Sequence, residues 1–208
     1  MPTVPLVHLA ARTIPDHDEL ALITRSVAGD RAAQHALFIA QRELVHRTLF
    51  RILGKNHDME DLLQDTFIQI FRSLARFRGE SSFARWCGII ATRVAWNYIE
   101  HRPGIPSSMD DVELHQVAGP VRDAEADFDA RDAARRLYSH LDRMDVKLRI
   151  SFTLAVVDGR PLAEVAILTN ASLVAVKTRV WRARRELERR ASKDVVLAAY
   201  LAQLGSHQ

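Results

Sequence analysis

A segment near the C-terminus, residues 176–187, constrains the fold most, because apolar and basic residues fall on opposite sides of one helix. At about 100° per residue, the apolar side carries Val176, Val180, Ala183 and Leu187. The other side carries Lys177, Thr178, Trp181, Arg182 and Arg185. We therefore expect one side to pack on a core and the other to remain free for a partner.

A short helix and a turn precede this segment. Pro161 suits a first helical position, and Leu162, Val165, Ala166 and Leu168 follow at helical spacing. Asn170 breaks the helix, and Ser172 is a plausible N-cap of the next one, whose free N–H groups suit phosphate. The pattern predicts a helix-turn-helix. The alternative is an ordinary helical hairpin with a solvated Arg-rich face.

The charge of the second helix indicates its partner. Residues 177–190 contain seven Lys or Arg and two Glu, a local charge of +5 that the whole-chain charge of +3 conceals. Such a surface favours a polyanion.

The composition predicts an all-α protein. The chain has 208 residues, 48% of them hydrophobic, which is enough for packed cores, and only eight Gly and seven Pro. The single cysteine, Cys87, allows no internal disulfide and is expected to be buried. No apolar run approaches the roughly 18 residues of a membrane span, and the N-terminus does not resemble a signal peptide. We expect a cytoplasmic protein without direct membrane insertion.

The first hundred residues predict a four-helix bundle. Asp16 or Asp18, Asp30, Asp58, and Ser81 or Ser82 can begin the helices, and Gly29, Gly54, Gly79 and Pro103-Gly104 can end them. The predicted domain covers residues 16–104.

A change in composition separates a second domain from this bundle. Residues 105–129 contain seven Asp or Glu and one Arg, without an apolar period, and are interpreted as a flexible acidic linker. Helices are expected at 131–141 and at 146–157, the latter capped by Asp145. They complete a domain over 130–190. An apolar stretch, 195–204 within the extension 191–208, is expected to pack back on this domain or to meet a partner.

Two further groups of residues raise the question of chemistry. The fourth helix places Arg85, Ile89 and Trp96 on one face near Arg93, with Phe77 just before it, which suits stacking on single-stranded DNA; packing in the core is the alternative. His57 and Asp61 stand four apart, but acidic residues are expected in a first helical turn and no second cluster completes a metal site. We predict no metal, no cofactor and no enzymatic activity.

The order of these motifs resembles the small, two-domain bacterial sigma factors of the extracytoplasmic-function (ECF) class. Residues 58–71 resemble the helix that binds core RNA polymerase, and residues 76–83 with Trp86 resemble the promoter-melting segment. Residues 158–184 resemble the domain that reads the −35 element. The similarity covers about residues 18–190.

The resemblance implies roles for single residues. Contacts with the β′ clamp helices of polymerase are implied for Asp61, Gln64, Asp65 and Ile68. Contacts with the −10 element are implied for Phe77, Arg85, Trp86, Arg93, Trp96 and Asn97. Contacts with the −35 element are implied for Ser172, Lys177, Thr178, Arg179, Trp181, Arg182 and Arg185. It also implies the polymerase β flap and an anti-sigma factor as partners.

Two other functions remain open at this point. A stand-alone helix-turn-helix regulator would use the first hundred residues as a sensor or dimerisation domain and would bind a palindrome without polymerase. A helical metal hydrolase would use His57 and the nearby carboxylates.

Overall fold

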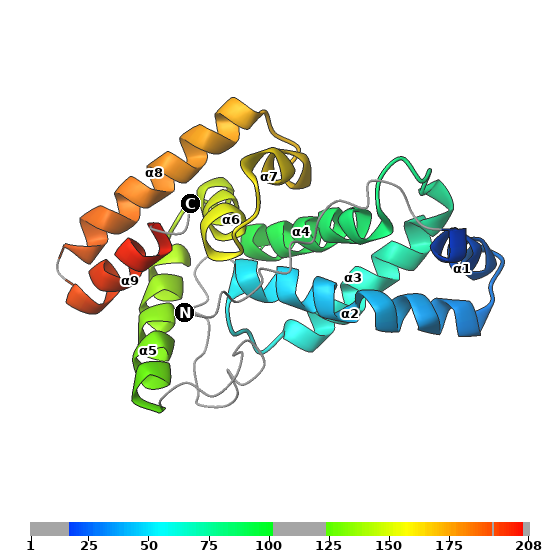
Figure 1. Ribbon diagram of the computed structural model, residues 1–208, viewed down its shortest axis with the longest axis horizontal. Coiled ribbons are helices and arrows are strands. Elements are labelled where there is room, and N and C mark those ends of the chain that lie inside the picture. Colours follow the sequence, from blue (N-terminus) through cyan, green and yellow to red (C-terminus); the bar gives the residue numbers. More distant parts are fainter. Residues whose placement is uncertain (1–16, 102–123, 193, 206–208) are drawn as a thin grey trace, which may run out of the picture.

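The computed structural model describes residues 17–101, 124–192 and 194–205, and within these ranges every regular element is helical (Figure 1). The helices form two units that lie side by side. The first unit contains α1 to α4 and the second contains α5 to α9. The all-α prediction with two helical units is therefore confirmed.

The first unit consists of four helices and one short 3-10 turn. Their bounds are α1 His17–Val27, α2 Arg31–Leu53, α3 Met59–Ser73, η1 Leu74–Arg76 and α4 Phe83–His101. The long helix α2 packs against α1, α3 and α4, and its fully buried side chains include Val45, Leu49 and Ile52. This bundle fixes the orientation of the exposed faces of α3 and α4.

Capping residues set the helix boundaries much as the sequence predicts. Asp30 caps α2 by accepting hydrogen bonds from the N–H groups of Ala32 and Ala33, and Ser82 accepts one from Arg85 at the start of α4. Asp58 departs from this pattern. It precedes α3 without forming a side-chain cap and instead accepts a hydrogen bond from the Tyr98 hydroxyl.

The second unit contains five helices and a π-helical turn. Their bounds are α5 Ala124–Leu141, α6 Val146–Phe152, η2 Thr153–Val157 (the π turn), α7 Leu162–Leu168, α8 Leu173–Ala191 and α9 Val195–Gly205. The predicted cap Asp145 accepts bonds from the N–H groups of Lys147 and Leu148. The expected helix over 146–157 is present as α6 followed directly by η2, so only its second part differs, by π-type hydrogen bonding.

The start of α5 differs from the prediction. The helix begins at Ala124, so residues 124–129, interpreted as the end of the linker, are helical. Acidic residues favour the N-terminal turns of a helix because they offset its positive dipole end. The low apolar content that suggested a linker is therefore compatible with a helix start.

The apolar C-terminal stretch packs back on the second unit. Helix α9 contacts α5, α8 and η2, and Leu197 is fully buried. Asp194 accepts a bond from the Leu197 N–H and forms an ion pair with Arg136 of α5 at 3.1 Å. The C-terminal helix is thus part of this unit's core.

Side chains of the second unit cap the C-terminal end of α2 in the first. Arg149, only 4% exposed, donates to the carbonyl oxygens of Ile52 (3.0 Å) and Leu53 (3.1 Å). Its third hydrogen bond joins Asp142 at 2.5 Å, and the Tyr138 hydroxyl donates to the Arg51 carbonyl at 2.8 Å. Three carbonyls that a helix end leaves without intrahelical partners are therefore satisfied across the interface.

Further contacts extend this interface beyond the end of α2. Arg51 pairs with Asp158 at 3.7 Å, and Arg160 donates to the Thr48 hydroxyl at 3.1 Å. Helix α4 packs against α6 and α7, where a Cβ added at Gly88 would lie 3.6 Å from the Leu168 side chain. Apolar and polar contacts together hold the two units in a closed arrangement.

Candidate nucleic-acid interface

The buried side of α8 anchors it to the second unit as the sequence predicts. Val176, Ala183 and Leu187 are fully buried, and Val180 packs against the same core. Helix α7 ends before Asn170, whose φ of +48° lies in the left-handed region, and α8 begins at Leu173. Asn tolerates this region better than most residues, so it suits the turn. The two helices form the predicted helix-turn-helix.

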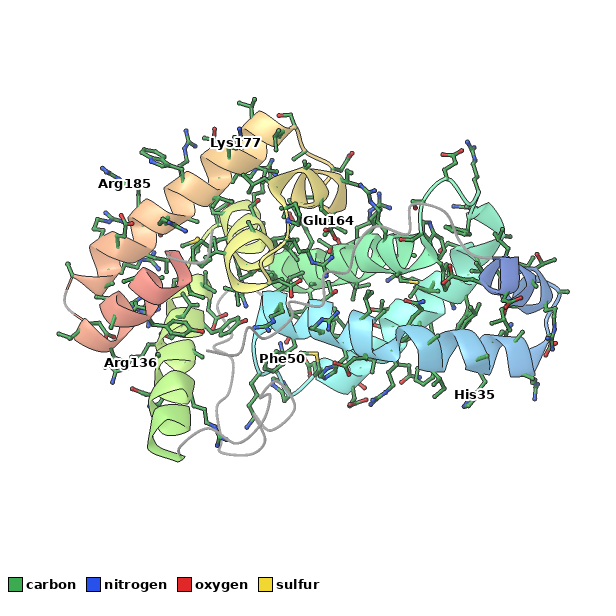
Figure 2. All side chains as sticks on the ribbon, in the orientation of Figure 1. His35, Phe50, Arg136, Glu164, Lys177 and Arg185 are labelled. Atoms are coloured by element: carbon green, nitrogen blue, oxygen red, sulfur yellow. The ribbon has the colours of Figure 1, made fainter. Side chains whose placement is uncertain are left out.

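The opposite side of α8 faces away from the rest of the molecule. Figure 2 shows Lys177 and Arg185 on the outer side of the helix, away from α6. Thr178, Trp181 and Arg182 are also exposed, Trp181 to 60%. The guanidinium of Arg185 lies 5.4 Å from the centre of the Trp181 ring, a cation–π contact. An aromatic and basic surface of this kind suits the groove of a nucleic acid.

The N-terminus of α8 is capped by its own sequence. The Ser172 hydroxyl accepts a hydrogen bond from the Ala175 N–H at 3.2 Å, which confirms its predicted role as N-cap. The other N–H groups of the first turn have no intrahelical acceptor, and with the positive dipole end they suit a phosphate.

Two positions on α8 differ from the sequence-based selection. Arg179 is half-buried rather than exposed, and within the described part of the chain its buried Nη1 has no hydrogen-bond partner. Val174 was not selected, yet it is 73% exposed on the outward face. Its helical spacing of four from Thr178 and seven from Trp181 could have revealed it.

The candidate residues of α4 share one side of that helix. Arg85, Trp86, Arg93, Trp96 and Asn97 fall within an arc of about 120° at 100° per residue. Arg93 and Asn97 are exposed, while Trp86 and Trp96 are half-buried. The arc lies opposite the buried Cys87, Ala91 and Val94.

Aromatic side chains cluster where α4 begins. The ring centres of Phe77 and Trp86 are 5.4 Å apart, and each lies within 5.6 Å of the fully buried Phe83 ring. Phe77 and Trp86 are therefore held by the core while part of each remains accessible. A half-buried, rigid ring is a suitable platform for an unstacked base, since it loses little conformational freedom on binding. Phe77 and Trp86 therefore pack on the core and also keep an accessible surface, so core packing and base stacking are compatible at these two positions.

Helix α3 presents a third surface. Asp61, Gln64, Asp65 and Ile68 are all exposed and lie within an arc of about 100°, with Ile68 37% exposed. Leu63, Phe67 and Ile70 occupy the buried side. This surface combines two carboxylates with one exposed aliphatic side chain, a composition that suits a protein partner with basic residues.

The chemistry of the described residues offers little for catalysis. Burial raises the pKa of the Cys87 thiol far above its usual value, so it is a poor nucleophile. Among residues 17–101, 124–192 and 194–205, no group of three or more His, Cys, Asp or Glu is placed to hold a metal ion. His57 contacts the neighbouring Asp58 at 3.2 Å.

None of the helices in residues 17–101, 124–192 and 194–205 is both long and apolar enough to cross a membrane.

Comparison with known families matches both units. Residues 37–102 match Sigma-70 region 2, and residues 134–187 match Sigma-70 region 4, together more than half of the chain. The two units therefore define a protein of the sigma-70 class. More narrowly, the chain belongs to the ECF family of RNA polymerase sigma factors. It directs RNA polymerase to promoters and is no member of an enzyme family. The stand-alone regulator is not favoured.

Individual relatives support this assignment over most of the chain. The ECF RNA polymerase sigma-E factor of Haemophilus influenzae is 29% identical over 175 residues, which are 81% of this chain and 92% of that protein. The Escherichia coli sigma-E factor is 25% identical over 80% of this chain and 91% of its own length. The solved structure of CnrH in complex with the cytosolic domain of CnrY has a similar fold, with a TM-score of 0.57, 23% identity, and coverage of 86% and 99%.

Proposed function

We propose that the outward face of α8 reads the −35 element in the major groove. The observation that carries this proposal is the exposed row of Lys177, Trp181, Arg182 and Arg185 on a helix whose other side is fully buried. Arg and Lys side chains read guanine edges, and one bidentate pair contributes about 1–3 kcal/mol of discrimination. Ser172 and the first turn of α8 face the phosphate backbone. Arg179 is half-buried, so only part of its side chain is available to contact the DNA.

The face of α4 then holds the −10 element. Arg93 and Asn97 are exposed one turn apart, and Arg85 and Trp96 lie on the same side. Phe77 and Trp86 provide the aromatic surface on which a base from the non-template strand stacks. Such a contact contributes roughly 1–3 kcal/mol per base, enough to offset the cost of unstacking one base.

The exposed side of α3 docks on the polymerase. We assign Asp61, Gln64, Asp65 and Ile68 to the contact with the β′ clamp helices, and the second unit to the β flap. Ile68 supplies apolar area at the centre, and the two carboxylates supply charge complementarity. We assign −10 recognition to residues 16–104 and −35 recognition to residues 130–190, which lie within the second unit.

Reading both elements requires the two units to separate. A compact chain of this length is about 40–45 Å across. The −35 and −10 elements lie roughly 25 base pairs apart, which is about 85 Å of B-form DNA. The closed arrangement with its Arg149 and Tyr138 contacts therefore opens when polymerase presents the protein to a promoter. The predicted linker between the units lies, over residues 102–123, outside the described residues.

Regulation and location follow from this function. Because the closed form and the promoter-bound form differ, a protein that binds both units when they are close together blocks initiation. We propose an anti-sigma factor as that partner; the similar fold of CnrH was determined in complex with the cytosolic domain of CnrY. The protein acts in the cytoplasm, where polymerase and DNA are, and catalyses no reaction itself.

Reconstitution tests the proposal. Purified chain is added to core RNA polymerase with a genomic promoter library, and transcript starts are mapped. A set of starts that share two elements and depend on the chain is expected. No gain in specific initiation over core polymerase alone would reject the function.

A further inference from the structure

The outward face of α8 contains an apolar strip at its centre. Val174 is 73% exposed and Trp181 60% exposed, and they lie within about 20° of each other around the helix. Thr178 lies between them along the axis. Lys177 and Arg182 flank this strip on either side. The basic residues attract DNA of any sequence, whereas the apolar strip is placed to contact the edge of a particular base.

The hydroxyl group of Thr178 is already engaged within the helix. Its Oγ1 donates to the Val174 carbonyl oxygen at 3.0 Å, so the hydroxyl is turned back along the helix. Its donor capacity is therefore used, and its methyl group adds to the apolar strip. The three residues together present an apolar surface rather than a set of hydrogen-bond donors.

The Trp181 side chain is held by a charged neighbour. The guanidinium of Arg185 lies 5.4 Å from the ring centre, which restrains the ring against the helix surface. An exposed apolar pair surrounded by cations is poorly explained by a purely electrostatic contact, because phosphates gain nothing from Val174. The major groove offers one apolar group, the 5-methyl group of thymine.

We propose that Val174 and Trp181 determine specificity by contacting thymine methyl groups in the −35 element. This inference rests on the proposed function of α8. The two residues are seven positions apart, about 10.5 Å along the helix axis, which corresponds to about two to three base-pair steps for a helix that lies in the major groove. The −35 element of this protein therefore contains two thymines separated by about two to three steps, with guanines read by the flanking basic residues.

Replacing thymine with deoxyuridine tests the proposal, because the two bases differ only in the methyl group. The −35 sequence is first selected from random DNA with core polymerase and the full chain. Deoxyuridine is then placed at each selected thymine, and promoter affinity is measured. We expect a loss of about four-fold for each contacted methyl group, the factor for removing one buried methyl-sized group from an apolar contact.

Two variants assign each methyl group to its residue. In Val174→Thr, which keeps the shape and exchanges a methyl for a hydroxyl group, deoxyuridine at one thymine has no further effect. Trp181→Gln abolishes the effect at the second thymine, about two to three steps away. Val195→Thr is the matched control, since Val195 is 85% exposed on α9, and it keeps both effects. The signature is the non-additivity of protein and DNA changes in a double-mutant cycle.

The outcomes separate this inference from the proposed function. Failure of the selection to yield any −35 preference overturns the function of α8 and this inference with it. A clear −35 preference with equal affinity for thymine and deoxyuridine overturns this inference alone. Retention of both deoxyuridine effects in Val174→Thr and in Trp181→Gln also overturns it, because the methyl groups are then read elsewhere.

Discussion

Replacing Arg149 with methionine should open the closed arrangement of the two units. The change removes the two hydrogen bonds to the Ile52 and Leu53 carbonyls, which cap α2 from the second unit. Hydrogen bonds from a charged donor contribute about 1.5–3 kcal/mol each. Loss of both weakens the closed state by about 3 kcal/mol at the least, which is more than a hundred-fold in the ratio of closed to open molecules.

Energy transfer between two dyes measures this opening. Cysteines replace His35 on α2 and Glu188 on α8, both exposed and in different units. The native Cys87 should stay unlabelled, because it is buried and its thiol pKa is raised by desolvation. Arg149→Met should lower the transfer efficiency, and the exposed Arg143→Met, with the same change of charge, should leave it unchanged.

A milder variant keeps the test informative if Arg149→Met also loosens the second unit. Its guanidinium pairs with Asp142 inside that unit, and loss of the pair is destabilising. Tyr138→Phe removes only the hydroxyl group that donates to the Arg51 carbonyl at 2.8 Å, about 1 kcal/mol or five-fold in the ratio. Unchanged energy transfer in both variants, with helix content preserved, would refute the role of these contacts.

Three further predictions concern other parts of the molecule. Gly54→Ala should destabilise the protein more than Gly29→Ala. Both glycines have positive φ, but only a Cβ at Gly54 would lie 2.8 Å from the Tyr138 ring across the interface. Chemical denaturation should show a difference of about 1–3 kcal/mol in the free energy of unfolding. Asp61→Arg should weaken binding to core polymerase at least ten-fold, and the exposed Glu43→Arg on α2 should not. The pKa of the Asp194 carboxyl is lowered by the hydrogen bond from the Leu197 N–H and by the ion pair with Arg136. Its contribution to the free energy of unfolding should therefore be complete above about pH 3.8 and should be lost as the pH falls through the lowered pKa. Asp194→Asn should reduce this acid-dependent loss of stability.

Each of these has a clear contrary result. Equal destabilisation by the two glycine substitutions would mean that Tyr138 does not pack closely against Gly54 at the end of α2. Equal loss of polymerase affinity by both charge reversals would indicate a general electrostatic effect rather than a docking face on α3. An unaltered acid transition in the asparagine variant would place the responsible carboxylates elsewhere.

Much of the fold was predictable because its helix ends carry local chemical signals. Asp30, Asp145 and Ser172 cap the helices that the sequence assigns to them, and Gly29 and Gly54 adopt the positive φ that suits a helix stop. These signals depend only on near neighbours in the sequence. The start of α5 at Ala124 was missed because acidic residues suit both a linker and the first turns of a helix.

The contact between the units has no comparable signal. Arg149 and Tyr138 donate to backbone carbonyl groups almost a hundred residues away in the chain. Because every residue has such a carbonyl group, the sequence does not indicate which one is bound. The exposed faces of α3 and α8 were predictable from helical angle. The half-buried position of Arg179 was not predicted, because it depends on packing between helices. The exposure of Val174 was not predicted either, because an apolar residue is expected in the core.

If α8 directs the choice of promoter, reversing the charge of its outward face should change where transcripts start. Core polymerase is combined with wild-type chain, with Lys177→Glu/Arg182→Glu, or with Arg143→Glu/Lys147→Glu, which changes the charge equally at exposed positions of the same unit. The α8 variant should lose initiation at promoters with an intact −35 element, while the control should keep it. Undiminished, correctly placed starts with the α8 variant would show that α8 does not direct the choice of promoter.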